Sequence, residues 1–232
     1  MTASPRRAGR LEHRLTTPNA SLADLDGAIA LAIEHELAAL TVNPWLVKAA
    51  KRQLGRSRVR LGTVVGYPSG AHVLAVKAFE ASKALEQGAT QIDFVLNVGA
   101  LVSRDEDAVY NDMLAVIDMA HSALAEVGVI LGPDPIAEPH LRRACLLAER
   151  AGADLVVTGT GDATAARSIG RSRIARDSLG IRVDVKACGR FRSAEEIAAA
   201  FEAGAARVST QLSPELLSVA SDAPQLAAAA VR

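Results

Sequence analysis

Residues 136–157 read IAEPHLRRACLLAERAGADLVV, and this stretch shows how the chain is built. Apolar residues recur at helical spacing as far as Ala151, glycine follows at once, and a short apolar run then ends at Val157. A glycine directly after a helical segment is typical of a left-handed helix cap. The stretch therefore predicts a helix, a cap at Gly152 and a short buried strand.

The same joint between helix and strand recurs at Gln87-Gly88-Ala89 and at Glu202-Ala203-Gly204-Ala205. Short β-branched runs alternate with longer alanine-rich stretches, which is typical of parallel βαβ construction. The predicted strands are Leu11 to Leu15, Ala38 to Val42, Arg58 to Val65, Gln91 to Leu96, Val127 to Leu131, Asp154 to Val157, Arg182 to Ala187 and Ala206 to Thr210. The predicted helical segments include Leu22 to Glu36, Val73 to Gln87, Glu106 to Ala125, Ile136 to Ala151, Ala163 to Ser178 and Ala194 to Ala203.

Eight parallel strands that alternate with helices predict a single-domain (β/α)8 barrel, also called a TIM barrel. The alternative is an open doubly wound sheet, but the chain has nothing like the glycine-rich first turn of that fold. A length of 232 residues suits one barrel. We assign residues 11–220 to the barrel, residues 1–10 to a disordered N-terminal arm and residues 221–232 to a C-terminal tail.

The composition argues against several classes of partner. Basic and acidic residues balance at 26 each and aromatic residues make up only 3%, so nucleic-acid binding is not expected. Neither the two cysteines nor the five histidines show ligand spacing, so we predict no metal site, and no cofactor is indicated. No apolar stretch suits a signal peptide or a membrane span, so we expect a cytoplasmic protein with no membrane partner.

Charged residues inside apolar strands mark the candidate active site, because the carboxyl ends of barrel strands form it. Asp93 and Lys186 each lie in such a strand, and Glu12 and Arg14 share one face of the first strand. The alternative for each is a residue that faces the helices or one that reaches solvent at the end of a strand. Their convergence on one rim favours a functional role.

Motifs over nearly the whole chain resemble those of the deoxyribose-phosphate aldolases, a class I family that forms a lysine Schiff base in a (β/α)8 barrel. The segments that carry the resemblance are residues 41–44 (TVNP), 62–71 (GTVVGYPSGA), 76–80 (VKAFE), 92–101 (IDFVLNVGAL), 151–161 (AGADLVVTGTG) and 185–189 (VKACG). The resemblance implies a lyase that performs aldol or retro-aldol chemistry on a small carbonyl compound, with deoxyribose 5-phosphate as the family substrate. It also implies a homodimer.

The departures from the family pattern fall at positions that take part in the family's catalytic reaction. Val157 stands where the family has its Schiff-base lysine, and valine cannot form an imine. Gly128 and Gly132 replace a lysine and a glutamate of the fifth strand. Arg14 stands at the place of a small hydroxyl residue, and Glu12 lengthens the acid of the first strand. We therefore identify the chain as a divergent member that lacks the usual Schiff-base lysine.

The resemblance also implies a phosphate site after the last three strands. Arg190 offers a cation there for a phosphate or a carboxylate, with a surface arginine at the rim as the alternative. The candidate substrate-binding residues are Glu12, Arg14, Asn43, Thr158, Thr160, Gly161, Gly189, Arg190 and Thr210.

Lys186 and Asp93 are the predicted catalytic residues. Lys186 matches the second lysine of the family and Asp93 matches its catalytic acid, so we predict an imine on Lys186 and proton transfer by Asp93. Arg14 would supply the cation that lowers the pKa of Lys186. The alternative for Lys186 is a structural ion pair with Asp93, Asp184 or Glu12.

Three functions are open at this point, and an aldolase-type lyase leads. The second is a repurposed biosynthetic enzyme, in which a protonated Lys186 stabilises an enolate during cyclisation, dehydration or isomerisation. The third is a non-catalytic pseudo-aldolase that binds a ligand.

Overall fold

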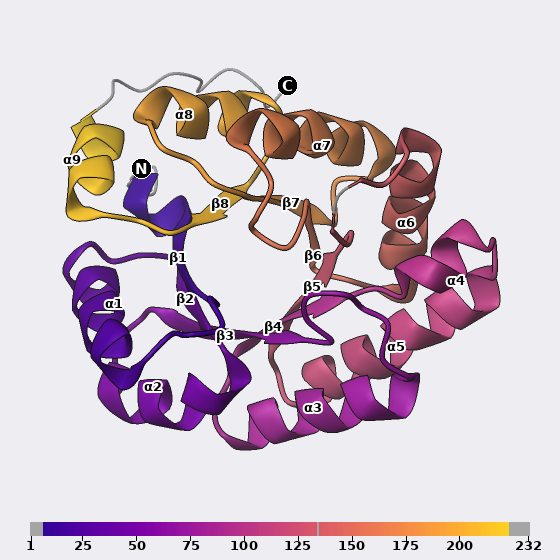
Figure 1. Ribbon diagram of the computed structural model, residues 1–232, viewed down its shortest axis with the longest axis horizontal. Helices are drawn as coiled ribbons and strands as arrows, with labels where there is room; N and C mark the ends of the chain where they lie inside the picture. The colour runs from indigo at the N-terminus through magenta and orange to yellow at the C-terminus, as the bar shows by residue number, and fades with distance from the viewer. Residues whose placement is uncertain (1–6, 134, 223–232) are drawn as a thin grey trace.

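The computed structural model describes residues 7–133 and 135–222, and their strands close into one parallel barrel in the order β1 to β8 (Figure 1). Each strand pairs with the next, and β8 pairs with β1 to close the ring. The bounds are β1 Leu11–Leu15, β2 Ala39–Val42, β3 Arg60–Val65, β4 Gln91–Val95, β5 Glu126–Ile130, β6 Leu155–Val157, β7 Asp184–Cys188 and β8 Arg207–Thr210. The predicted (β/α)8 barrel is confirmed, and every strand bound lies within two residues of its prediction.

The helices form a ring around the strands (Figure 1). They are α1 Leu22–Glu34, α2 Val47–Leu54, α3 Leu74–Glu86, α4 Val98–Val102, α5 Glu106–Ser122, α6 Glu138–Ala151, α7 Ala165–Ser178, α8 Ala194–Glu202 and α9 Pro214–Asp222, with short 3-10 helices η1 Arg7–Arg10 and η2 Pro44–Leu46. Helices α2, α4 and α9 lie outside the predicted helical segments. None of the helices in the described part of the chain combines the length and apolar character that a membrane span requires.

The three predicted cap glycines end their helices as expected. Gly88, Gly152 and Gly204 have φ angles of 103°, 89° and 93°. Side chains disfavour this left-handed backbone, so glycine allows the chain to turn sharply from each helix into the next strand.

The chain differs from the predicted N-terminal arm over residues 7–10. These residues form η1, and the guanidinium of Arg10 donates to the carbonyl oxygens of Ala206 at 2.9 Å and Ala205 at 3.0 Å. These bonds tie η1 to the start of β8. Residues 1–6, residue 134 and residues 223–232, which include most of the predicted C-terminal tail, lie outside the described residues.

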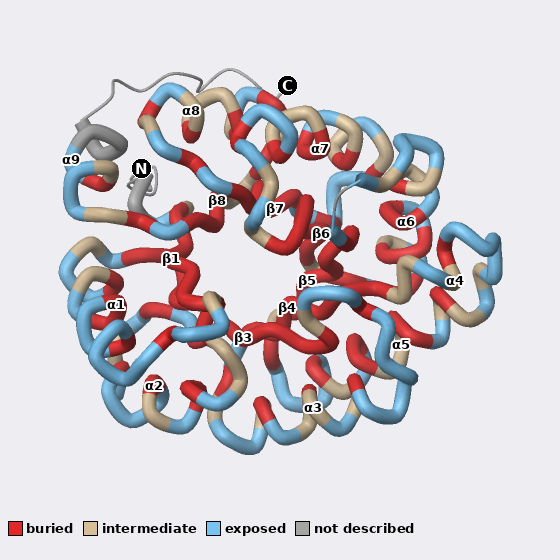
Figure 2. Tube along the Cα trace, in the orientation of Figure 1, coloured by how far each residue is buried: buried red, intermediate tan, exposed pale blue. Residues whose placement is uncertain are grey.

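Alternate residues of each strand face two different environments, as the period of a strand requires. Side chains such as Ile92 and Phe94 of β4 point outward and belong to the main apolar core between the barrel and its helices. Their neighbours Gln91, Asp93 and Val95 point into the barrel. Figure 2 shows the result, with the strands buried and the outer faces of the helices exposed. Inward-pointing side chains are therefore held in place by strands that are packed on both faces.

His13 joins the first strand to the segment after the last. Its Nδ1 accepts a hydrogen bond from the backbone N–H of Leu212 at 3.1 Å. Burial lowers the pKa of His13 to about 4. His13 is therefore neutral at pH 7, which leaves Nδ1 free to accept this bond.

We expect the free energy of unfolding to fall as the pH is lowered from 6.5 toward about 4, because the unfolded chain protonates His13 before the folded chain does. The full shift corresponds to about 3 kcal/mol. The change His13→Asn supplies an amide oxygen that can accept the bond without titrating, so urea unfolding at about pH 7 and about pH 4.5 should show a weaker pH dependence. The exposed His72→Asn variant is the control, and equal pH dependence in the two variants would contradict this role.

Candidate active site

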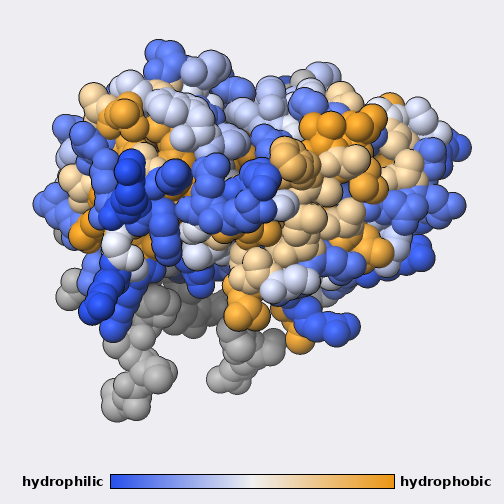
Figure 3. Space-filling view, turned by 90° about the horizontal axis from the view of Figure 1, so that it is seen from below, coloured by the Kyte–Doolittle hydropathy of each residue, from blue (hydrophilic) through white to orange (hydrophobic). Residues whose placement is uncertain are grey.

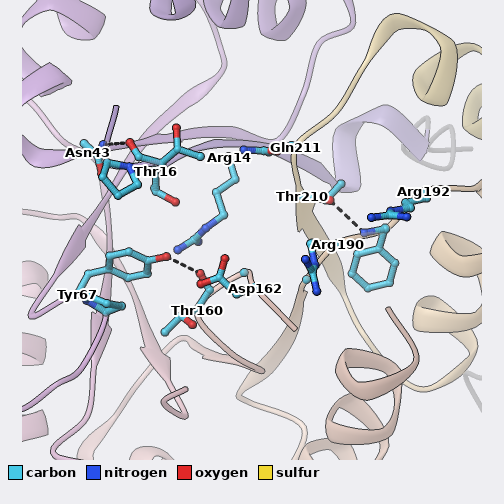
Figure 4. Close-up of a pocket in the computed structure, with 16 residues that line it drawn as sticks. Arg14, Thr16, Asn43, Tyr67, Thr160, Asp162, Arg190, Arg192, Thr210 and Gln211 are labelled. Atoms are coloured by element: carbon cyan, nitrogen blue, oxygen red, sulfur yellow. Dashed lines mark hydrogen bonds between the residues drawn. The ribbon is translucent and has the colours of Figure 1, made fainter. Parts of the chain in front are cut away.

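A cavity of about 610 Å³ opens at the carboxyl-terminal rim of the barrel, where the loops after the strands meet (Figure 4). Seven of the predicted substrate-binding residues line it, namely Arg14, Asn43, Thr160, Gly161, Gly189, Arg190 and Thr210. The lining also includes residues outside the predicted set, among them Thr16, Tyr67, Asp162, Phe191, Arg192 and Gln211. Each of these closely follows the carboxyl end of a strand, and this position in the sequence could have identified them as candidate site residues.

The charge of the cavity is positive. Its charged lining consists of Arg14, Arg190 and Arg192 against the single carboxylate of Asp162. In the view of Figure 4, Asp162 lies between Arg14 and Arg190. The cavity thus suits an anionic ligand. Among the described residues, no group of three or more histidine, cysteine or acidic side chains is arranged to hold a metal ion.

Arg14 occupies the inner end of the cavity. It is 4% exposed, and its Nε, Nη1 and Nη2 atoms have no hydrogen-bond partner among the described residues. The centre of the Tyr67 ring lies 5.3 Å from the guanidinium carbon, and the Tyr67 hydroxyl donates to the Thr160 carbonyl oxygen at 2.8 Å. A Cβ atom at Gly161 would lie 2.9 Å from Arg14 Nε. Glycine at 161 and a tethered Tyr67 ring therefore shape the space that Arg14 fills.

An apolar layer lies inside the barrel below the lining of the cavity, and the lining residue Tyr67 packs against it. The layer consists of the fully buried side chains of Val95, Ile130, Val157 and Cys188. Burial raises the pKa of Cys188, so this side chain stays a neutral thiol. We call these four residues the floor layer.

A buried ion cluster lies one layer below the floor. Lys186 Nζ donates to Glu12 Oε2 at 2.9 Å and to the two carboxylate oxygens of Asp93 at 2.9 and 2.8 Å. The three side chains are fully buried. Each precedes an inward-pointing residue of the layer above by two positions, as Lys186 precedes Cys188 and Asp93 precedes Val95. None of the three lines the cavity.

Lys186 is a positively charged ammonium in this cluster. Burial alone would lower the pKa of Lys186, but the carboxylates of Asp93 and Glu12 outweigh it and raise the pKa above its ordinary value. The geometry therefore contains the structural ion pair that is the alternative role of Lys186, with Asp93 and Glu12 as its partners.

Residues 9–168 match the DeoC/LacD family of aldolases. The chain belongs to this family. It is 39% identical to a deoxyribose-phosphate aldolase of Thermococcus gammatolerans over 202 residues, 86% of this chain and 90% of that protein. It is 38% identical to a deoxyribose-phosphate aldolase of Streptococcus pneumoniae over 207 residues, 89% of this chain and 93% of that protein.

Solved structures of aldolases also superpose on the barrel of this chain. The structure of an aldolase named QR15 superposes with a TM-score of 0.82 at 27% identity and covers 94% of this chain and 95% of that one. A deoxyribose phosphate aldolase from Aeropyrum pernix, whose structure is tetrameric, superposes with a TM-score of 0.81 at 28% identity and covers 94% and 92%. The similarity to aldolases thus extends over nearly the whole chain, and the protein is a lyase of this family.

No lysine of this aldolase lines the cavity, although all five lie within the described residues. Val157, where the family resemblance leads us to expect the Schiff-base lysine, belongs to the floor layer. Lys77 is buried outside the barrel, where it pairs with Asp112 at 2.7 Å. Lys48, Lys51 and Lys83 are exposed on α2 and α3. The cations that reach the cavity are all guanidinium groups.

The ion cluster explains the glycine on the fifth strand. A Cβ atom at Gly128 would lie 2.6 Å from Asp93 Oδ1 and 2.9 Å from a methyl group of Val157. Asp93 and Val157 together occupy the space that a side chain at position 128 would need. The lysine of the family pattern is therefore incompatible with this arrangement.

Two of the predicted substrate-binding residues lie away from the cavity. Glu12 belongs to the ion cluster. Thr158 is buried, where its hydroxyl accepts from the backbone N–H of Cys188 at 2.9 Å and bonds to the Ser168 hydroxyl at 2.9 Å. It thereby ties β6 to β7 and α7. Asn43 lies at the edge of the cavity and donates to the Thr17 carbonyl oxygen at 2.8 Å, which joins the loops after β1 and β2.

We expect Lys186→Met to lower the free energy of unfolding at neutral pH by about 3 to 5 kcal/mol, because Asp93 would be left as a buried carboxylate without its cation and Glu12 would keep only the longer pair with Arg207 at 3.4 Å. Lys83→Met removes the exposed pair between Lys83 and Glu86 and should cost less than about 1 kcal/mol. Chemical denaturation of both variants measures the difference. A Lys186→Met variant as stable as Lys83→Met would show that the cluster contributes little to stability.

Proposed function

We propose that this aldolase is a lyase that makes or breaks the bond between the α and β carbons of a small anionic β-hydroxycarbonyl substrate. The observation that carries the proposal is an arginine-lined cavity at the catalytic rim of a barrel of this family. Family membership favours aldol chemistry over a repurposed enzyme and over a non-catalytic barrel.

Deoxyribose 5-phosphate is the substrate that the names of the relatives suggest. Arg190 and Arg192 are exposed at the outer part of the cavity and offer two guanidinium groups to its phosphate. The backbone N–H groups of Gly189 and Arg190 already donate to the carbonyl oxygens of Ser209 and Ala163. Phosphate recognition in this loop would therefore depend on side chains rather than on those two amides.

The charged groups of the cavity support a reaction without an imine. In the cleavage direction, Asp162 takes the proton from the substrate hydroxyl, the carbon–carbon bond breaks, and its electron pair moves to the carbonyl oxygen. The guanidinium of Arg14 stabilises the resulting enolate oxygen. Asp162 then returns the proton to the enolate carbon, so that an aldehyde and a second carbonyl compound leave.

For Lys186 and Asp93 we propose a supporting role in this reaction. An imine on Lys186 would require the ammonium to leave both carboxylates and the floor layer to open, because Val157 and Cys188 separate it from the cavity. The ion cluster instead holds the strand ends that position Arg14 and the floor.

A homodimer and a cytoplasmic location remain predictions for this aldolase. The start of α3 exposes the apolar side chains of Val73, Val76 and Phe79. Figure 3 shows apolar side chains gathered over α3 on this face of the molecule. Exposed apolar groups of this kind support the assembly of copies of the chain.

Incubation with deoxyribose 5-phosphate, followed by measurement of the acetaldehyde released, tests the reaction. We expect Asp162→Asn to reduce kcat by about 100-fold or more, because the amide cannot take up or return the proton. The exposed Asp118→Asn variant should keep the wild-type rate. Wild-type activity in Asp162→Asn would contradict the role of this carboxylate, and inactivity of the wild type toward this and related hydroxycarbonyl compounds would contradict the proposed function.

Borohydride reduction in the presence of acetaldehyde tests the absence of an imine. We expect the intact mass of the wild type to show no adduct on Lys186, and Val157→Lys to gain an adduct at position 157. An amine at that position would lie near the cations of Arg14 and Lys186 in an apolar layer, which lowers its pKa. The control is Val157→Met, which introduces a larger side chain without an amine and should form no adduct. A wild-type adduct on Lys186 would restore the imine mechanism.

A further inference from the structure

Arg14 is a buried cation whose hydrogen-bonding capacity is unused. All three guanidinium nitrogens are buried and lack a partner among the described residues. A buried polar group without a partner costs free energy, and a charged group costs more than a neutral one. A side chain with this cost and with access to a cavity is a binding group for a ligand that completes its hydrogen bonds.

The groups around Arg14 do not supply that partner. Tyr67 interacts with Arg14 and helps to raise the pKa of the guanidinium, but its hydroxyl donates to Thr160 and does not meet the guanidinium nitrogens at hydrogen-bond geometry. The Asp93 carboxylate lies one layer below, where both oxygens accept from Lys186. Asp162 is exposed at the opening of the cavity, and no hydrogen bond joins it to Arg14 in the described residues.

The charges below the floor select among anions. Lys186 pairs with Asp93 and Glu12, Arg207 pairs with Glu12 and Glu126, and two positive charges against three ionised carboxylates leave this cluster net negative. A phosphate dianion at Arg14 would bring two more negative charges toward this cluster. A carboxylate brings one, and its planar pair of oxygens matches the guanidinium fork.

We propose that Arg14 binds the carboxylate of a small 2-oxo acid at the inner end of the cavity. The proposal rests on the proposed function, because aldol chemistry needs the carbonyl oxygen at the same guanidinium. In a 2-oxo acid the carboxylate and the carbonyl are adjacent, so one guanidinium can reach an oxygen of each. Arg190 and Arg192 remain at the outer part of the cavity for a second anionic group.

Calorimetric titration with sodium pyruvate, acetaldehyde and inorganic phosphate tests the proposal. We expect pyruvate to bind the wild type and Arg14→Met to weaken this binding by about 10- to 100-fold, the range for hydrogen bonds to a charged group. Phosphate binding should change less than about 3-fold in Arg14→Met, since the outer arginines are intact. Acetaldehyde, which lacks the carboxylate, should bind equally weakly to both proteins. The exposed Arg182→Met variant is the matched control and should bind as the wild type does.

The Arg14→Lys variant guards against a folding defect in Arg14→Met. It keeps the charge but loses the fork, so pyruvate binding should still fall by about 10-fold. Failure of the wild type to bind pyruvate, unchanged binding in both Arg14 variants, or an equal loss of pyruvate and phosphate binding would overturn the proposal. These titrations measure binding without turnover. If pyruvate binds through Arg14 but the protein has no lyase activity, only the proposed function is contradicted. If the protein has lyase activity but does not bind pyruvate, only this inference is contradicted.

Discussion

The ion pair of Lys186 with Asp93 and Glu12 is the interaction on which the interior of this barrel depends. It joins β7 to β4 and β1 across the centre of the molecule, where full burial deprives a single charge of its solvation. Because an unpaired buried charge is costly, the three residues must stay together. Their positions also determine what surrounds them, since Asp93 leaves no room for a side chain at Gly128.

The floor layer separates this charged interior from the cavity. Val157 contributes to it at the position where the family resemblance expects a reactive amine. Valine at this position cannot act as a nucleophile, and it lies beside Lys186 in the register of β6 and β7. The chemistry available to a ligand is then that of the cavity lining, in which guanidinium groups and one carboxylate are the charged side chains.

Membership of the aldolase family is compatible in physical terms with a cavity whose described lining contains arginines and no lysine. The fold depends on the outward-pointing apolar residues of the strands and on the glycine caps of the helices, and these can persist while inward-pointing residues change. Aldol chemistry needs an electron sink at the carbonyl and a group that moves a proton. A guanidinium and a carboxylate meet those needs differently from an imine lysine, and they favour a substrate whose carbonyl end carries its own negative charge.

The local pattern of the sequence determined the architecture. The alternation of apolar runs with helical segments, the glycines at positions 88, 152 and 204 and the family motifs are all local, and each describes one element or one joint. They also identified Arg14, Asp93, Lys186 and Arg190 as the charged residues of interest. Only the tertiary structure decided which of them share an environment, because Glu12 and Lys186 are 174 residues apart and meet through the register of a closed barrel. That register puts Lys186 beneath the floor layer and Arg14 at the cavity without a hydrogen-bond partner among the described residues. Neither position can be predicted from the spacing of residues along the chain.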